Sequence, residues 1–292
     1  MALSSSPKVL GIFFSSGDLG DVGRHAVAAA LEMPPTVVAT IRVFSRDIAS
    51  MEKANWKCGC GQHSLSQKDR SRIQLVQLDC TEDDLVPSLL NVDAIVSCLG
   101  SRQPFHKERI VRKGTERLVE AAIRCKIERF VMLSSVGIGD DWPPMQWCQE
   151  GRMLEGFFRT ICWIQYQDLS AAERSAREGA LENPSFNFLI VRPVVLSEHR
   201  EPVGTWRVQI AKHEDHPTTE ISKMDCARLM ITEAVFPSMS QRAIVLGGNQ
   251  HIEDFKTSNE YWANLQVPFF CQAQKLQATT TDKPAKTRGR IF

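Results

Sequence analysis

Three glycines at a fixed spacing carry the clearest chemical signal in the sequence. Gly17, Gly20 and Gly23 recur every third residue, between an apolar run at 9–14 and an alanine-rich segment at 22–31. A strand, a glycine loop and a helix in this order are typical of a dinucleotide-binding turn. One glycine allows a tight turn with positive φ, one lets the backbone approach a pyrophosphate, and one lets the helix pack closely on the sheet. The free N–H groups at the start of the helix would then face the phosphates.

Two carboxylates in this loop oppose that interpretation. Asp18 and Asp21 would both stand near bound phosphates. Asp21 suits the N-terminus of the helix, where an aspartate caps free N–H groups. Asp18 has no such role, so it would weaken phosphate binding. A glycine turn that binds nothing is the alternative that such a motif leaves open.

The end of the second apolar run, at 36–44, bears on the choice between NAD and NADP. Ser45, Arg46 and Asp47 follow it directly. An acidic residue here usually binds the ribose hydroxyls of NAD, whereas an arginine accommodates the 2′-phosphate of NADP. A planar guanidinium suits phosphate, so we expect Arg46 to bind NADP, with Ser45 as a second donor. The alternatives are an Arg46 that is merely solvated, and an Asp47 that favours NAD.

The elements that must position these residues follow from apolar runs and their periodicity. Helices are expected at 22–31, 85–90, 110–123 and 166–177, and a long surface connection at 47–72. The expected strands are 9–14, 36–44, 73–78, 93–100, 129–135, 187–193 and 242–248. Because strands alternate with helices and crossovers are right-handed, the sequence predicts an α/β fold, a Rossmann-type doubly wound parallel sheet.

We predict a single NAD(P)-binding Rossmann domain over residues 1–272, followed by a disordered basic tail over 273–292. The tail has five Lys or Arg residues and few apolar ones, which favours a solvated segment over a nucleic-acid-binding arm. A tryptophan-rich helical insert near 139–165 interrupts the regular alternation. It could pack on the body of the domain, or it could form a wall or lid over a pocket, because aromatic residues line both cores and binding sites.

Charge and hydropathy exclude several classes of protein. The chain has 292 residues, and its 35 Lys and Arg nearly balance its 34 Asp and Glu, which argues against a protein that binds mainly nucleic acid. No apolar run reaches the roughly 18 residues that predict a membrane-spanning helix. The first residues resemble neither a secretory signal nor a transit peptide, so we expect a cytoplasmic protein.

Nine cysteines are scattered along the chain, and their number is odd. Most lie in apolar runs, as Cys80, Cys98 and Cys162 do, which indicates reduced thiols in the core. Cys58, Cys60 and His63 form one local cluster, but no second Cys/His pair lies nearby to complete a metal site. We therefore expect a glycine-rich surface loop here and no metal.

With these residues in place, the chain resembles the atypical short-chain dehydrogenase/reductase superfamily. It is most similar to the NAD(P)H-binding, NmrA-like group that includes biliverdin-IXβ reductase/flavin reductase, over about residues 8–250. Each motif is modest alone, and their order along the chain carries the resemblance. The motifs are the GxxGxxG loop, Ser45–Asp47, Leu78–Asp79, Val96–Gly100, Phe130–Gly137, Val191–Pro193 and Ile221–Asp225.

The resemblance implies a role for each matching position. Asp79 would lie by the adenine, Gly100 and Ser101 by the nicotinamide ribose and phosphates, and Ser134 near the nicotinamide ring. Together with the glycine loop, the expected cofactor contacts are Gly17, Asp18, Leu19, Gly20, Asp21, Val22, Gly23, Ser45, Arg46, Asp79, Cys80, Leu99, Gly100, Ser101, Ser134, Pro193 and Val194. Ser135 corresponds to the superfamily's catalytic serine.

The chain departs from the superfamily at its acid–base pair. The superfamily uses Tyr-x-x-x-Lys, in which the lysine lowers the pKa of the tyrosine, but Tyr166 is followed four residues later by Ser170. Tyr166 therefore lacks the group that would activate it. It could still donate a hydrogen bond, and otherwise it packs in the core. Val195 replaces a histidine of the biliverdin-IXβ branch, which puts tetrapyrrole reduction in doubt.

An intact cofactor motif without a tuned acid favours direct hydride transfer. We expect an NADPH-dependent oxidoreductase that reduces a small planar acceptor such as a flavin or a quinone, because the cofactor then carries the difficult step. Ser135 would hydrogen-bond the acceptor or the carboxamide. The alternative is a non-catalytic NAD(P)-sensing regulator or scaffold of the NmrA-like kind. The sequence does not reveal the oligomeric state.

Overall fold

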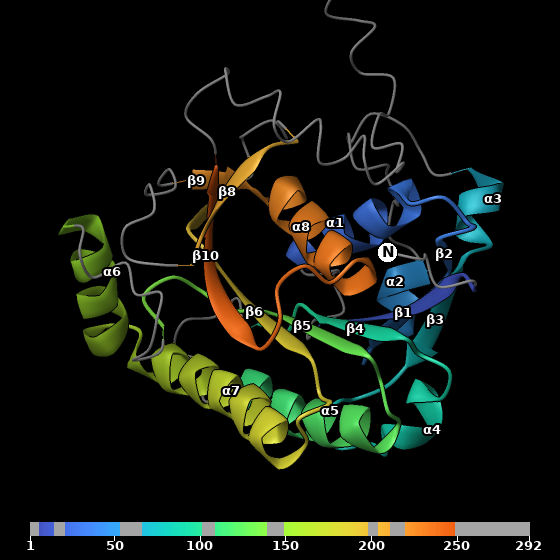
Figure 1. Cartoon of the computed structure of the whole chain (residues 1–292), viewed down its shortest axis with the longest axis horizontal. Coiled ribbons are helices and arrows are strands. Elements are labelled where there is room, and N and C mark those ends of the chain that lie inside the picture. Colours follow the sequence, from blue (N-terminus) through green and yellow to red (C-terminus); the bar gives the residue numbers. More distant parts are fainter. Residues whose placement is uncertain are drawn as a thin grey trace, which may run out of the picture.

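Eight strands form one sheet in the computed structural model of the chain (Figure 1). The structure describes residues 6–14, 21–52, 66–100, 109–138, 149–197, 204–210 and 220–248. The order across the sheet is β3-β2-β1-β4-β5-β6-β10-β8, and only the last pair is antiparallel. The strands are β1 (Lys8–Phe13), β2 (Val38–Ser45), β3 (Ile73–Gln77), β4 (Ala94–Ser97), β5 (Arg129–Leu133), β6 (Phe188–Pro193), β8 (Trp206–Gln209) and β10 (Arg242–Gly248).

Helices cover both faces of this sheet. On one face α1 (Asp21–Glu32) packs against α8 (Lys223–Val235), and on the other α5 (Ile110–Arg124) packs against α7 (Trp163–Glu182). Shorter elements complete the fold: α2 (Ile48–Glu52), α3 (Gln67–Arg70), α4 (Val86–Leu89), α6 (Gln149–Thr160), and a small parallel pair, β7 (Val195–Ser197) with β9 (Glu220–Ser222). This arrangement confirms the predicted Rossmann-type α/β fold.

Side chains of the central strands alternate between the two faces. Leu10 and Ile12 of β1 join the core beneath α1 and α8, whereas Phe13 joins the core beneath α5 and α7, where its ring stacks on Phe44 at 4.2 Å between centroids. Strands buried on both faces read as continuous apolar runs without a polar face. That is why the parallel strands were visible in the sequence.

An ion pair joins the two helices of one face across a long stretch of chain. Arg228 of α8 donates two hydrogen bonds to the carboxylate of Glu32 in α1, both at 3.0 Å. Burial raises the pKa of Glu32, against the opposing effect of the Arg228 cation. The N-terminal and C-terminal parts of the described chain are thereby fastened to each other.

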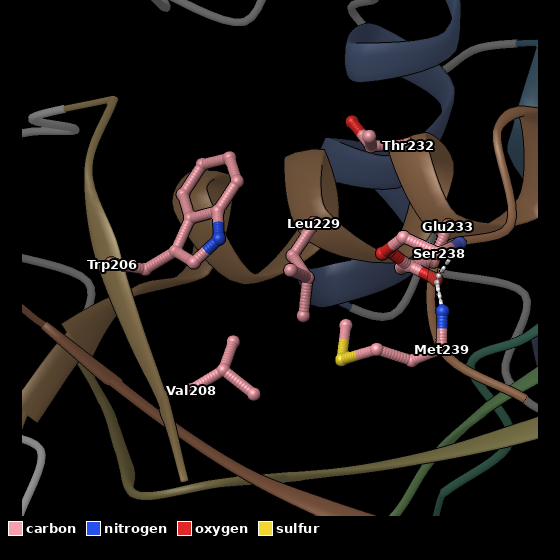
Figure 2. Close-up of a pocket in the computed structure, with 7 residues that line it drawn as sticks. All are labelled: Trp206, Val208, Leu229, Thr232, Glu233, Ser238 and Met239. Carbon is pink, nitrogen blue, oxygen red and sulfur yellow. Dashed lines mark hydrogen bonds between the residues drawn. The ribbon is translucent and has the colours of Figure 1, made fainter. Parts of the chain in front are cut away.

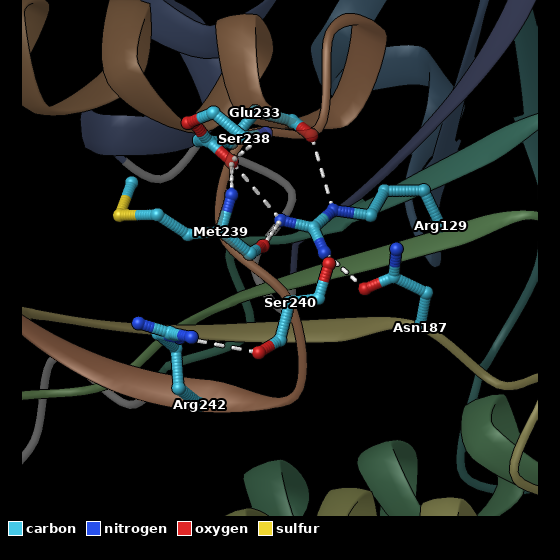
Figure 3. Close-up of polar contacts among 7 residues, drawn as sticks. All are labelled: Arg129, Asn187, Glu233, Ser238, Met239, Ser240 and Arg242. Carbon is cyan, nitrogen blue, oxygen red and sulfur yellow. Dashed lines mark hydrogen bonds and ion pairs between the residues drawn. The ribbon is translucent and has the colours of Figure 1, made fainter.

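A fully buried cation, Arg129, lies at the amino-terminal edge of the sheet (Figure 3). Arg129, which is fully buried at the start of β5, donates to the backbone oxygen of Glu233 at 3.0 Å and to its carboxylate at 3.2 Å. It also donates to the Met239 carbonyl at 2.6 Å and to the side chain of Asn187. Burial lowers the pKa of Arg129 to about 10, although Glu233 opposes that shift.

Several expectations about elements need correction or lie outside the described residues. The connection at 47–72 contains two short helices, α2 and α3. The predicted insert near 139–165 includes α6, and α7 already begins at Trp163. Residues 139–148, the cysteine loop at 58–63 and the tail at 273–292 lie outside the described residues.

The contacts of α6 place it beside the turn that follows β5. A Cβ at Gly137 in that turn would lie 3.4 Å from both the Glu155 backbone nitrogen and the Phe158 ring. Phe157 on the same helix is 45% exposed, so α6 is packed on one side and faces solvent on the other. Helix α6 thus contacts the body of the domain, and whether the insert also forms a wall of the pocket stays a prediction.

The described cysteines are free thiols: Cys80, Cys98, Cys125, Cys162 and Cys226. Burial raises the pKa of both Cys80 and Cys98 to about 12. Thiols with so high a pKa are poor nucleophiles at neutral pH, as expected of core residues.

Candidate functional site

The carboxyl ends of the parallel strands meet at one edge of the sheet. Strands β2 and β3 lie on one side of β1 in the sheet, whereas β4 lies on the other side. Crossovers in opposite directions leave a crevice at this point, where open α/β sheets bind their ligands. Apart from Tyr166, which lies in α7, the sequence-predicted site residues that the structure describes lie at or just beyond the ends of β1, β2, β3, β4, β5 and β6, along this edge.

The last glycine of the loop is the one whose packing the structure describes. A Cβ on Gly23 would lie 2.6 Å from Cδ1 and 3.0 Å from Cγ of Phe14, the residue that follows β1. Real Cβ atoms do not approach that closely, so Gly23 lets α1 pack directly on the end of β1. Gly17, Asp18, Leu19 and Gly20 lie outside the described residues. Asp21 is the first residue of α1, and Val22 is buried.

The residues expected around the adenosine half come together at the ends of β2 and β3. The Arg46 guanidinium lies 3.8 Å from the Asp79 carboxylate. Ser45 is buried, and its hydroxyl accepts a hydrogen bond from the Asp47 backbone N–H at 3.2 Å. A cavity of about 400 Å³ opens beside them, lined by Arg46, Asp79, Thr81, Glu82, Arg109, Ile110 and Lys113. Its volume falls within the range of roughly 300–1,000 Å³ that is usual for small-molecule sites.

Asp79 is held in its charged form beside this cavity. Burial raises its pKa, but hydrogen bonds from the Thr81 backbone and hydroxyl, at 2.8 and 2.6 Å, and the Arg46 cation outweigh that effect. The net result is a lowered pKa. Lys113 pairs with Glu82, so both cations and carboxylates line the cavity.

Cys80, the residue after Asp79, lies in the core beneath α5 and α7. It is buried, and a Cβ on Gly114 of α5 would lie 2.9 Å from its sulfur and 2.8 Å from Leu99. Cys80 and Leu99 are thus packed against a helix rather than open to the crevice. Gly100 is exposed, and no atom lies within 4 Å of a Cβ placed on it, while Ser101 falls outside the described residues.

The two serines after β5 have different partners. Ser134 is buried, and its hydroxyl donates to Glu173 of α7 at 2.6 Å. Ser135 is half-buried, and its hydroxyl donates to the Val136 carbonyl at 3.2 Å. Ser134 therefore faces the protein interior, whereas Ser135 is the more accessible of the pair.

Pro193 and Val194 stand at the end of β6, as expected. The Pro193 carbonyl accepts the Val136 N–H at 3.1 Å, and the Val194 N–H donates to Leu246 of β10 at 2.9 Å. These bonds extend the pairing of β5, β6 and β10 beyond the strands themselves. They connect the strand ends beneath the place expected for the nicotinamide half.

Tyr166 is buried in α7 and enclosed by its neighbours. Its ring stacks on Trp163, with 5.6 Å between centroids and 11° between planes, and the Arg159 guanidinium lies 5.3 Å from the ring centroid. The ring thus contacts both an indole and a cation, which favours a packing role for Tyr166.

Asp168 lies beside the candidate site, and the sequence analysis did not identify it as a functional residue. It is 4% exposed, and its carboxylate accepts the backbone N–H groups of Val111 at 3.2 Å and Arg112 at 2.8 Å. Because the N-cap residue of α5 makes no side-chain cap bond, this carboxylate of α7 caps α5 from outside. Burial raises the pKa of Asp168, against the effect of the two N–H groups.

We expect Asp168→Ala to lower the free energy of unfolding by about 1–2 kcal/mol, because two buried N–H groups lose their acceptor. Urea denaturation followed by circular dichroism measures the change. Glu178→Ala, at an exposed position of the same helix, is the control and should leave stability within about 0.5 kcal/mol of the wild type. Equal stability of the two variants would show that the cap contributes nothing.

Another cavity lies away from this edge, between α8 and β8 (Figure 2). Its volume is about 170 Å³, below the usual size of a ligand site. It is lined by Trp206, Val208, Leu229, Thr232, Glu233, Ser238 and Met239. None of these is a predicted cofactor residue, so this cavity is separate from the crevice.

A protein family described as NAD(P)H-binding matches residues 17–235, which is most of the chain. The chain belongs to this NAD(P)H-binding family. The match begins at the glycine loop and ends with α8, so it covers the elements from α1 to α8 and starts just after β1. The match confirms that the sequence motifs mark an NAD(P)H-binding protein, while the NmrA-like subgroup stays a prediction.

Solved structures of this kind share the fold. A short-chain dehydrogenase/reductase from Veillonella parvula, solved in complex with NADP, has a TM-score of 0.57 at 14% identity, covering 83% of this chain and 95% of that one. A candidate NADH-flavin reductase from Streptococcus pneumoniae has a TM-score of 0.56 at 15% identity, covering 83% of this chain and 100% of that one. At these identities the likeness shows the fold alone.

Curated relatives include Protein TIC 62, chloroplastic, of Arabidopsis thaliana, which is 23% identical over 241 residues, 80% of this chain and 35% of the relative. The rice protein of the same name is 25% identical over 201 residues, 65% of this chain and 36% of the relative. The chain thus spans about a third of the length of these relatives. Both relatives are named as chloroplastic proteins. The cytoplasmic location that we predicted for this chain therefore stays a prediction.

None of the helices in the described part of the chain combines the length and apolar character that crossing a membrane requires.

Proposed function

We propose that this NAD(P)H-binding protein is an NADP-preferring oxidoreductase that transfers hydride from NADPH to a small planar acceptor such as a flavin or a quinone. The observation that carries the proposal is the pairing of Arg46 with Asp79 at the mouth of a 400 Å³ cavity, at the end of the second strand. A guanidinium at that position suits a 2′-phosphate. Asp79, kept charged beside it, would accept hydrogen bonds from the adenosine.

The glycine loop and Gly23 would bring the helix N-terminus of α1 to the pyrophosphate. The residues that follow β4, β5 and β6 would then border the nicotinamide half. In this arrangement the cofactor supplies the hydride. The chain binds and orients the cofactor and the acceptor, and it excludes water from them. Ser135, accessible at the end of β5, would donate its hydroxyl to the acceptor or to the carboxamide.

Replacing Arg46 by alanine is expected to weaken NADPH binding by about tenfold to a hundredfold, because a charge-assisted phosphate contact is lost. NADH binding should change little. Calorimetric titration of the purified chain with each cofactor measures both affinities. Arg124→Ala, at an exposed position near the end of α5, is the matched control. An Arg46→Ala variant that keeps the preference for NADPH would rule out the NADP assignment.

Turnover is tested separately from binding. Steady oxidation of NADPH with FMN or a quinone as acceptor is the expected result, and saturating cofactor without turnover over a panel of such acceptors would contradict it.

The packing of Tyr166 between Trp163 and Arg159, with no lysine at position 170, favours a second candidate. In that case the chain is a non-catalytic sensor of the NADP pool that binds both redox forms. A sensor would bind NADP⁺ and NADPH with comparable affinity and consume neither.

A further inference from the structure

A buried hydrogen-bonded cluster stands behind the serines at the end of β5. Glu173 accepts the Ser134 hydroxyl at 2.6 Å, and Arg192 donates to both oxygens of the same carboxylate. Arg177 adds a bond to Glu173 at 3.4 Å. Ser134, Glu173 and Arg192 are 7%, 2% and 1% exposed, so these three side chains are almost completely excluded from solvent.

Hydrogen bonds from β6 and from α7 hold the backbone of residues 134–136. The Ser134 N–H donates to the Val191 carbonyl at 2.7 Å, and the Val136 N–H donates to the Pro193 carbonyl at 3.1 Å. Arg192, between those two carbonyls, reaches across to Glu173 with its side chain. Residues 134–136 are therefore held by backbone bonds on β6 and by a side-chain bond to α7.

Stability alone is a weak reason for this arrangement. Removing two charges from water costs several kcal/mol, and buried ion pairs often stabilise a fold no more than apolar residues of the same volume would. A buried pair that holds a loop at the crevice can instead define one geometry. The cluster contacts the segment that carries Ser135, the accessible serine.

We infer that Glu173, anchored by Arg192, is a positioning residue that sets the geometry of the nicotinamide half of the site through Ser134. The inference rests on the proposed function, since it concerns how the same cofactor is held. It assigns Ser134 to the support of the site rather than to contact with the ring. Ser135, carried on the fixed segment, is then the serine that meets cofactor and acceptor.

The chain offers a matched control at the opposite edge of the sheet. Glu233 is also 2% exposed and also pairs with a buried arginine, Arg129, but at the amino-terminal edge (Figure 3). Glu173→Gln and Glu233→Gln therefore remove equivalent charges from equivalent surroundings. Only the first lies beside the crevice.

Two probes separate the halves of the cofactor. Adenosine 2′,5′-bisphosphate reports the adenosine half, and NADPH reports both halves. We expect Glu173→Gln to weaken NADPH binding by about tenfold, the effect of one or two lost charge-assisted bonds, and to leave bisphosphate binding within about twofold. Glu233→Gln should change neither affinity. Ser134→Ala, which keeps the ion pair, should weaken NADPH binding in the same direction by a smaller factor.

Each outcome has a defined meaning. If Glu173→Gln leaves NADPH binding unchanged, or weakens NADPH and bisphosphate equally, the positioning role is wrong while the proposed function stands. If both glutamine variants weaken NADPH alike, the effect is general loss of stability and the inference fails. Should Glu173→Gln not fold, Ser134→Ala decides by the same two probes. A wild-type chain that binds neither probe overturns the proposed function itself.

Discussion

Gly23→Ala is expected to lower the free energy of unfolding by about 1–3 kcal/mol and to weaken NADPH binding by at least about tenfold. The new Cβ would lie 2.6 Å from the Phe14 ring. Phe14 is 3% exposed and lies in the core beneath α1, so its ring has no room to turn away. The start of α1 must move instead, and with it the N–H groups that are proposed to face the pyrophosphate.

Urea denaturation and NADPH titration of the same preparation measure the two effects of Gly23→Ala. Gly156→Ala is the control, because no atom lies within 4 Å of a Cβ at that helical, exposed position. Alanine there should be neutral or stabilising by up to about 1 kcal/mol, since glycine is a poor helix former. Wild-type stability and affinity in Gly23→Ala would show that α1 does not need this close approach.

Arg129→Ala is expected to cost about 3–5 kcal/mol of stability, a large share of the roughly 5–15 kcal/mol available to a typical domain. The substitution leaves the Glu233 carboxylate buried without its cation and removes donors from the Met239 carbonyl and Asn187. We expect a lower midpoint of urea denaturation and a poor yield of folded protein.

Arg242→Ala serves as the control for Arg129→Ala. Arg242 lies in the same corner of the sheet but is exposed and donates to the Ser240 carbonyl at 3.2 Å (Figure 3). Its loss should change stability by no more than about 0.5 kcal/mol. Equal losses in the two variants would mean that burial of the cation adds nothing to its effect.

Most of the sheet was predictable from the sequence because its central strands are buried on both faces. The run at 242–248 matches β10 residue for residue, and the run at 73–78 differs from β3 by one residue. The elements that were missed have weaker signals. Helix α8 is buried nearly all round and buries polar residues among its apolar ones, so it shows little helical periodicity, and β8 is a four-residue edge strand.

The candidate site was predictable only where a motif marks it. Arg46 and Asp79 are far apart in sequence but follow neighbouring strands, so the topology alone brings them together. Asp168 and Glu173 have no such signal, because an acidic residue within a helix ordinarily faces solvent. Their burial depends on partners in α5 and β6 that only the assembled fold provides.

The bond between Arg228 and Glu32 has a consequence for how the protein is made. Helix α1 is synthesised well before the helix that covers it, α8, because nearly 200 positions separate the two. While the ribosome is still translating the intervening strands, the apolar side of α1 stays uncovered. Contacts this distant in sequence form slowly, and exposed apolar surface in the interval invites aggregation. A nascent chain that has emerged only as far as β6 should therefore depend on chaperones, and release from them should follow the emergence of α8.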